Sequence, residues 1–134
     1  MEKNKANDAT GECSCGCSQA PKVIYACSGS SDVGEITDRA ARKLSAEGAG
    51  KMTCIAGIGG RAGALLDIAN AAEYILALDG CPQNCAKKTL ELAGYKDFGH
   101  IGLYDLGLPK GKSPATEKNI AKVVEKGKEM LLNR

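Results

Sequence analysis

The sequence predicts an α/β fold, a small three-layer domain with a parallel sheet of about four strands, of the Rossmann or flavodoxin-like type. Two observations lead to this prediction. From residue 22 onward, short β-rich runs alternate with amphipathic stretches, which is the pattern of successive βα units. The run YILALD at residues 74–79 is apolar almost throughout, as expected for a strand that helices cover on both faces.

Composition favours a single domain in a reducing compartment. A chain of 134 residues can bury one core, so we expect one α/β domain over 22–134, preceded by a flexible tail over 1–21. The net charge of +2 and the scarcity of aromatic side chains argue against a nucleic-acid partner. No run resembles a signal peptide or a membrane span, so we expect a cytoplasmic protein without a membrane partner. Seven cysteines then indicate metal or redox use rather than a disulfide framework.

The first half of the domain contains two strand-helix units. The first strand is expected over 23–27, and the helix after it over 32–47, where Asp32 and Glu35 resemble a capping box and Gly48 ends the helix. The second strand is expected over 51–56. The glycine-rich run GIGGRAG then leads into a helix over 64–72.

The second half of the domain repeats the pattern. The third strand is expected over 74–79. Cys81 is expected to be the N-cap of the next helix, with Pro82 at the first helical position, and that helix ends at Gly94. A fourth strand is expected over 100–105. Ser113 and Pro114 are expected to open the last helix.

Four cysteines fall where predicted strands end. Each of the first three strands carries a thiol at or near its carboxyl end, and a fourth thiol follows one helical turn later: Cys27, Cys54, Cys81 and Cys85. Because the carboxyl ends of parallel strands meet at one edge of the sheet, we expect the four sulfurs to share one crevice. Four sulfurs suit a soft, tetrahedral metal site, with zinc as the expected ion and an iron–sulfur cluster as the inorganic alternative.

Other residues are expected to support this site. Arg61 is expected to offset the negative charge of four thiolates, and its alternative is a solvated surface residue. Asp79 is expected to orient the Cys81 turn or a neighbouring amide. The single histidine, His100, is expected at the surface or the core edge rather than on the metal. Three tail cysteines either capture soft ions for the core site or belong to an incidental cysteine-rich linker: Cys13, Cys15 and Cys17.

The runs CSGSSDVGEI, KMTCIAGIGG and LDGCPQNC together make the chain resemble the DGC-domain family, which is named for its Asp-Gly-Cys motif. The likeness covers about residues 23–108. It implies that this family's four characteristic cysteines, which are described as zinc-binding, correspond here to Cys27, Cys54, Cys81 and Cys85. The resemblance supplies a ligand set and no reaction. A site that all four cysteines close predicts a structural or sensory role, whereas one that leaves a cysteine free predicts a catalytic or metal-handling role.

Two other interpretations of the same residues remain open. Cys81, with Cys85 or Cys27 as the resolving thiol, could instead serve a redox enzyme or a carrier of sulfur or selenium. The glycines of the run Gly57-x-Gly59-x-x-Ala62 match a dinucleotide-binding fingerprint, although a tight turn beside the sulfur site is the favoured interpretation. The scarcity of histidine excludes a Ser-His-Asp triad from the candidates.

Overall fold

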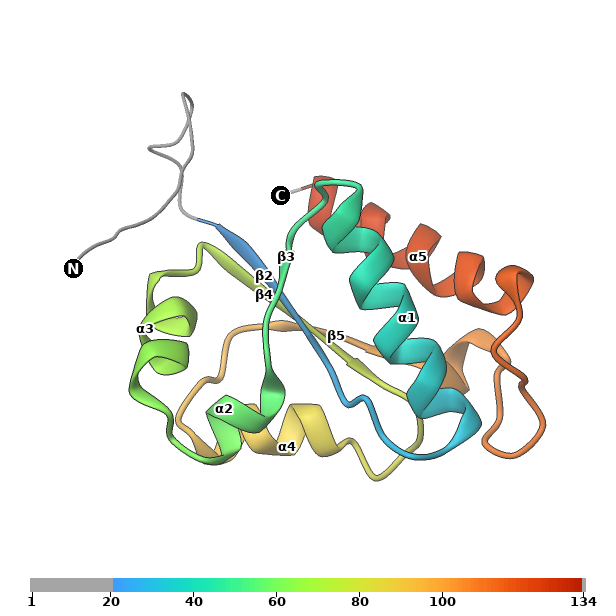
Figure 1. Cartoon of the computed structure of the whole chain (residues 1–134), viewed down its shortest axis with the longest axis horizontal. Coiled ribbons are helices and arrows are strands. Elements are labelled where there is room, and N and C mark those ends of the chain that lie inside the picture. Colours follow the sequence, from blue (N-terminus) through green and yellow to red (C-terminus); the bar gives the residue numbers. More distant parts are fainter. Residues whose placement is uncertain (1–20, 134) are drawn as a thin grey trace.

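The computed structural model describes residues 21–133 and contains an all-parallel sheet of four strands with helices on both faces (Figure 1). The strands lie in the order β3-β2-β4-β5. Their bounds are β2 (Lys22–Ala26), β3 (Lys51–Met52), β4 (Tyr74–Asp79) and β5 (Gly99–Gly102). The helices are α1 (Asp32–Ala46), α2 (Ile55–Gly59), α3 (Gly63–Ala71), α4 (Cys85–Leu92) and α5 (Glu117–Leu132), with a 3₁₀-helix η1 (Leu103–Leu106). The predicted α/β fold class is therefore confirmed.

The strand order places the topological switch point of the sheet between β2 and β4. Counted along the described chain, the order is 2-1-3-4, which is the beginning of the flavodoxin-type order. β2 pairs with β4 along its whole length, from Lys22 opposite Tyr74 to Ala26 opposite Leu78. The chain leaves β2 toward β3 on one side of this pair and leaves β4 toward β5 on the other side. The carboxyl ends of β2 and β4 therefore form the topological switch point, where such folds bind their ligands.

Two hydrophobic clusters cover the two faces of the sheet. Alternate residues of β2 face opposite sides, so Ile24 joins the cluster formed with α1 and α5, whereas Val23 joins the cluster formed with α2, α3 and α4. The residues of β4 alternate in the same way. Figure 1 shows α1 and α5 on one side of the strands and the three shorter helices on the other. This arrangement is the predicted three-layer fold.

The second strand is much shorter than expected. β3 contains only Lys51 and Met52, and the residues predicted to extend it form the connection to α2. Helix α2 is favoured by tertiary packing, because Ile58 is fully buried against the α2–α4 face of the sheet. A methyl group on Gly57 would overlap the side chain of Leu65, so this glycine permits α2 and α3 to pack closely.

One predicted cap and two predicted element boundaries differ from the structure. The N-cap of α1 is Ser31, whose Oγ accepts from the Gly34 amide, so Asp32 and Glu35 do not form the expected capping box. The fourth strand ends at Gly102 and continues as η1. Helix α5 starts after the N-cap Thr116 rather than at Ser113-Pro114. Ser31 and Thr116 each cap their helix by accepting a hydrogen bond from a nearby backbone amide, and sequence spacing does not specify which short polar side chain takes this role.

No helix within residues 21–133 is long and apolar enough to span a membrane. The expected flexible tail and its cysteines at positions 13, 15 and 17 lie outside the described residues.

Candidate functional site

The predicted cysteines follow three neighbouring strands at one edge of the sheet. Cys27 comes directly after β2, whereas Cys54 and Cys81 lie two residues beyond β3 and β4. Cys85 is the first residue of α4, whose amino end lies at this edge (Figure 1). Because β2 lies between β3 and β4, the three strand ends are direct neighbours at the usual strand spacing of about 5 Å. Cys54 and Cys85 are exposed, and Cys27 and Cys81 are half-buried.

Cys27 is held by a threonine of α1. Its Sγ lies 3.4 Å from Thr37 Oγ1, which also accepts a hydrogen bond from the Ser28 amide. The Thr37 hydroxyl donates its one proton to the Gly34 carbonyl at 2.7 Å. Because that proton is already used, Cys27 is the donor in its contact with Thr37.

Cys27 and Cys81 pack against opposite faces of the sheet. Cys27 contacts the cluster on the α2–α4 side, and Cys81 contacts the cluster on the α1 and α5 side. Within residues 21–133, no three side chains of histidine, cysteine, aspartate or glutamate come together as metal ligands. The arrangement therefore brings the four cysteines to one edge but does not form a closed four-sulfur site.

Asp79 caps the amino end of α4 from the neighbouring strand. Its side chain is 1% exposed, and its two oxygens accept from the amides of Ala86 and Lys87 at 2.8 and 3.0 Å. These amides belong to the first turn of α4, where the helix dipole also favours a carboxylate. The predicted N-cap at Cys81 is therefore wrong: α4 begins three residues later than predicted, after Asn84 in the left-handed conformation.

His100 is the third partner of Asp79. Its Nε2 lies 2.9 Å from Asp79 Oδ2, and its side chain is 19% exposed. The position at the edge of the core agrees with the sequence, but the pairing with Asp79 could not be predicted because it joins two neighbouring strands. Tyr104 adds a similar bond, donating from its hydroxyl to Asn84 Oδ1 at 2.9 Å. Together these contacts fix the backbone that carries Cys85.

Arg61 lies away from the amino end of α4. Its guanidinium donates to the carbonyls of Ile58 and Gly59 at the end of α2 and to Leu92 at the end of α4. Cys85 and Leu92 are the first and last residues of α4, which puts about 10 Å of helix between them. Arg61 therefore stabilises two helix carboxyl ends, and the structure does not bring it to the thiols.

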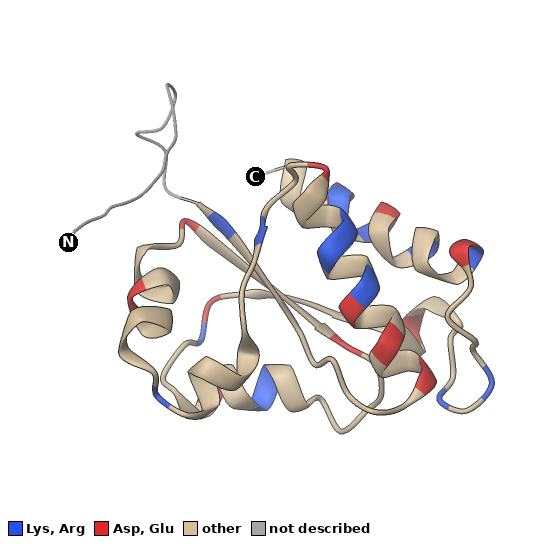
Figure 2. Ribbon diagram, in the orientation of Figure 1, with Lys and Arg blue, Asp and Glu red and all other residues tan. Residues whose placement is uncertain are grey.

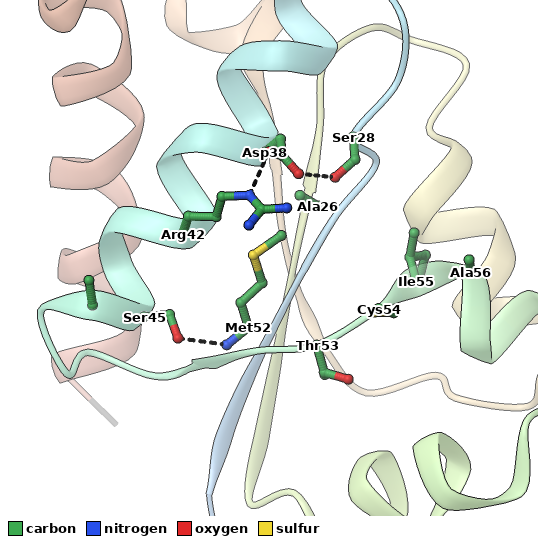
Figure 3. A pocket seen from close by; sticks show the side chains of 11 residues that line it. Ala26, Ser28, Asp38, Arg42, Ser45, Met52, Thr53, Cys54, Ile55 and Ala56 are labelled. Atoms are coloured by element: carbon green, nitrogen blue, oxygen red, sulfur yellow. Dashed lines mark hydrogen bonds and ion pairs between the residues drawn. The ribbon is translucent and has the colours of Figure 1, made fainter.

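A pocket beside Cys54 was not predicted from the sequence. It has a volume of about 700 Å³ and lies between α1 and the segment that joins β3 to α2 (Figure 3). Its polar lining includes Arg42, Asp38 and Ser28. Burial alone would raise the pKa of Asp38, but hydrogen bonds from Arg42 and Ser28 outweigh it and hold that pKa below its usual value. No motif pointed to this pocket, because its walls come from separate segments.

Tyr25 is another residue that the sequence did not single out. It belongs to β2, is fully buried on the α2–α4 side of the sheet, and its hydroxyl has no hydrogen-bond partner within residues 21–133. Burial, followed by the charges of Tyr95 and Cys54, raises the pKa of Tyr25 to about 12. The phenol is therefore a protonated donor within electrostatic reach of Cys54.

The glycine run does not have the geometry of a dinucleotide-binding loop. In that fingerprint the glycines form the turn between a strand and a helix. Here Gly57 and Gly59 lie inside α2, and Ala62 is the N-cap of α3. This agrees with the favoured structural role of the glycines.

Comparison with known proteins gives one family and one curated relative. The sequence model of the DGC-domain family matches residues 23–127 of this chain. The "Anaerobic and virulence modulator AnvM" of Pseudomonas aeruginosa is 39% identical over 88 residues, which are 66% of this chain and 67% of the relative. No solved structure matches.

Proposed function

The chain belongs to the DGC-domain family, and on this premise we propose that it binds one soft metal ion, zinc, through the thiols at the carboxyl edge of its sheet. The proposed ligands are Cys27, Cys54, Cys81 and Cys85. One observation carries the proposal: three neighbouring parallel strands are each followed within two residues by a cysteine, and the next helix begins with a fourth. Thiolate sulfur is the ligand that closed zinc sites use most.

Metal binding requires the edge to rearrange, because no three of its thiols meet in the described arrangement. Cys27 has to lose its proton and leave Thr37, and the exposed Cys54 and Cys85 have to turn toward the switch point. A site that must rearrange suits a sensor better than a purely structural site. The relative's description as an anaerobic and virulence modulator favours the same regulatory role.

Elemental analysis of the full chain, purified without oxygen, tests the proposal. We expect one zinc per chain and no visible absorption, whereas an iron–sulfur cluster would be coloured. Serine in place of any one edge cysteine should remove most of the zinc and lower the melting temperature of the loaded protein. The matched control replaces the three tail cysteines together, C13S/C15S/C17S, and should keep the zinc.

A thiol enzyme or carrier is the second candidate, and the absence of a three-ligand group within residues 21–133 favours it. It would use Cys81 as the nucleophile, with Cys85 or Cys27 resolving. The same purified protein separates the two candidates. Metal-free chains with a reversible internal disulfide, lost in Cys81→Ser, would contradict the zinc proposal and support thiol chemistry.

A further inference from the structure

The pocket beside Cys54 exists because β3 is so short. Only Val23 and Ile24 of β2 pair with β3, so the carboxyl half of β2 has no strand beside it on that side. The chain instead turns into α2, which leaves a space of about 700 Å³ against α1. That volume is in the range of sites for small organic ligands, roughly 300–1,000 Å³. The apolar part of the lining consists of Ala26, Ala46, Met52, Ile55 and Ala56.

A guanidinium is held over this pocket with part of its binding capacity unused. Arg42 Nε donates to Asp38 Oδ2 at 2.7 Å, and Asp38 Oδ1 accepts from Ser28 Oγ at 2.8 Å. The two terminal nitrogens of Arg42 have no hydrogen-bond partner among the residues that the structure describes. Figure 3 shows Arg42 reaching from α1 across Met52. A fixed guanidinium with free terminal nitrogens is suited to a carboxylate.

A thiol lies on the other wall of the same pocket. Cys54 is exposed and lines the pocket together with Thr53 and Ile55. The pKa of Arg42 is raised first by its hydrogen bond to Asp38 and further by the nearby Cys54, so the two groups are within electrostatic reach. The pocket therefore presents a cation, an apolar lining and a soft nucleophile to one occupant.

We propose that this pocket binds a low-molecular-weight disulfide that carries a carboxylate, and that Cys54 exchanges with it. The carboxylate would bind the free nitrogens of Arg42. The Cys54 thiol gives its proton to solvent, and its sulfur attacks one sulfur of the bound disulfide. The ligand's S–S bond breaks as the Cys54–ligand S–S bond forms, and the other half leaves as a thiolate with the electron pair. Cys54 is thereby oxidised and the departing half is reduced.

This inference deepens the proposed function, because a mixed disulfide at Cys54 would take one thiol away from the metal site. The pocket would then couple the state of the cellular thiol pool to metal binding. The exchange itself requires no metal, so the two ideas can be tested separately.

Adduct formation on the full-length chain tests the proposal. The probe is oxidised glutathione, the uncharged control is 2-hydroxyethyl disulfide, and the rate at each cysteine is read by peptide mass mapping. We expect the glutathione adduct to form faster on Cys54 than on Cys85, which is also exposed but does not line the pocket. Arg42→Met should slow the glutathione reaction at Cys54 about tenfold and leave the uncharged reagent unaffected.

Arg39→Met is the matched control, because Arg39 lies on the same helix and contacts Glu117 rather than the pocket. It should leave both rates unchanged. Equal glutathione rates at Cys54 and Cys85, or an unaltered rate in Arg42→Met, would overturn the proposal. The reaction is run on the chain as purified and after washing with a chelator. The zinc content of the untreated sample tests the proposed function. The adduct rates of the chelator-washed sample test the proposal about the pocket.

Discussion

Asp79, Gly80 and Cys81 make three different contacts, although they are consecutive. The Asp79 carboxylate caps α4 and pairs with His100. A methyl group on Gly80 would come within 2.8 Å of Val33 Cγ2 and 2.9 Å of the Val33 carbonyl carbon, so the end of β4 touches the start of α1 here. Cys81 packs on the α1 and α5 side of the sheet. The Asp-Gly-Cys motif is thus explained residue by residue through packing and capping.

Asp79→Asn should lower the free energy of unfolding by about 2 kcal/mol. The amide keeps one acceptor oxygen, but its NH₂ group then faces either the Ala86 amide or both the Lys87 amide and His100, and the charge-assisted bonds are lost. Urea denaturation measures the change. Asp97→Asn is the control, since this exposed aspartate makes no hydrogen bond among the described residues. Equal stability of the two variants would contradict the capping role.

Gly80→Ala should be destabilising by about 1–3 kcal/mol, because its methyl group meets the backbone of α1 as well as a side chain. Gly63→Ala provides the comparison. An added Cβ at Gly63 meets nothing within 4 Å, and alanine favours helix α3, so this variant should be neutral or slightly more stable. Thermal unfolding of both variants checks the prediction, and a neutral Gly80→Ala would show that β4 and α1 can separate without cost.

At the scale of the elements, the start of α1 also holds the loop before α5. The side chain of Asp32 accepts from the amides of Gly111 and Ser113 at 2.9 and 3.0 Å and from Val33 at 2.8 Å. The backbone hydrogen bonds, from Gly111 first and then Ser113, lower the pKa of Asp32. The carboxylate thus joins two segments that are far apart in sequence.

Asp32→Asn should make the stability of the protein less dependent on acid pH. A carboxyl group with a lowered folded pKa stabilises the protein above its unfolded pKa of about 4, and this contribution is lost as the pH falls through the folded value. Wild type should therefore lose more stability than Asp32→Asn between pH 6 and 3, as measured by urea midpoints. Identical pH profiles would mean that Asp32 does not contribute; Asp97→Asn again serves as the control.

Local sequence signals specified the bounds of some elements better than those of others. The strand over Tyr74–Asp79 was predicted with both bounds confirmed, because an apolar run between polar ends is a local signal. The second strand was predicted too long, because Ile55 and Ile58 can serve either a strand or a helix. The helix is favoured because it buries Ile58 against the sheet, and the strand residues that Ile58 packs against are remote from it in sequence.

At the scale of the whole molecule, two opposite connections determine where the site lies. The chain leaves β2 on the side of α1 and returns to β4 through α2 and α3 on the other face (Figure 1). The positions of charged residues are spread over the helices and loops, and few lie on the strands (Figure 2). At the switch point, Cys27 follows β2 and Cys81 follows β4, and these two thiols are the reason why a soft ligand is proposed there.

The local pattern of the sequence alone determined the α/β class, the central strand, the first helix and the edge of the sheet at which the four cysteines lie. Each of these follows from hydrophobic periodicity and from the rule that parallel strands end at the same edge. Only the tertiary structure decided which groups meet there. Asp79 accepts hydrogen bonds from α4 and pairs with His100. Cys27 contacts Thr37, and Arg42 lines the same pocket as Cys54. Such pairs depend on how separate elements pack, and spacing along one chain does not specify that packing.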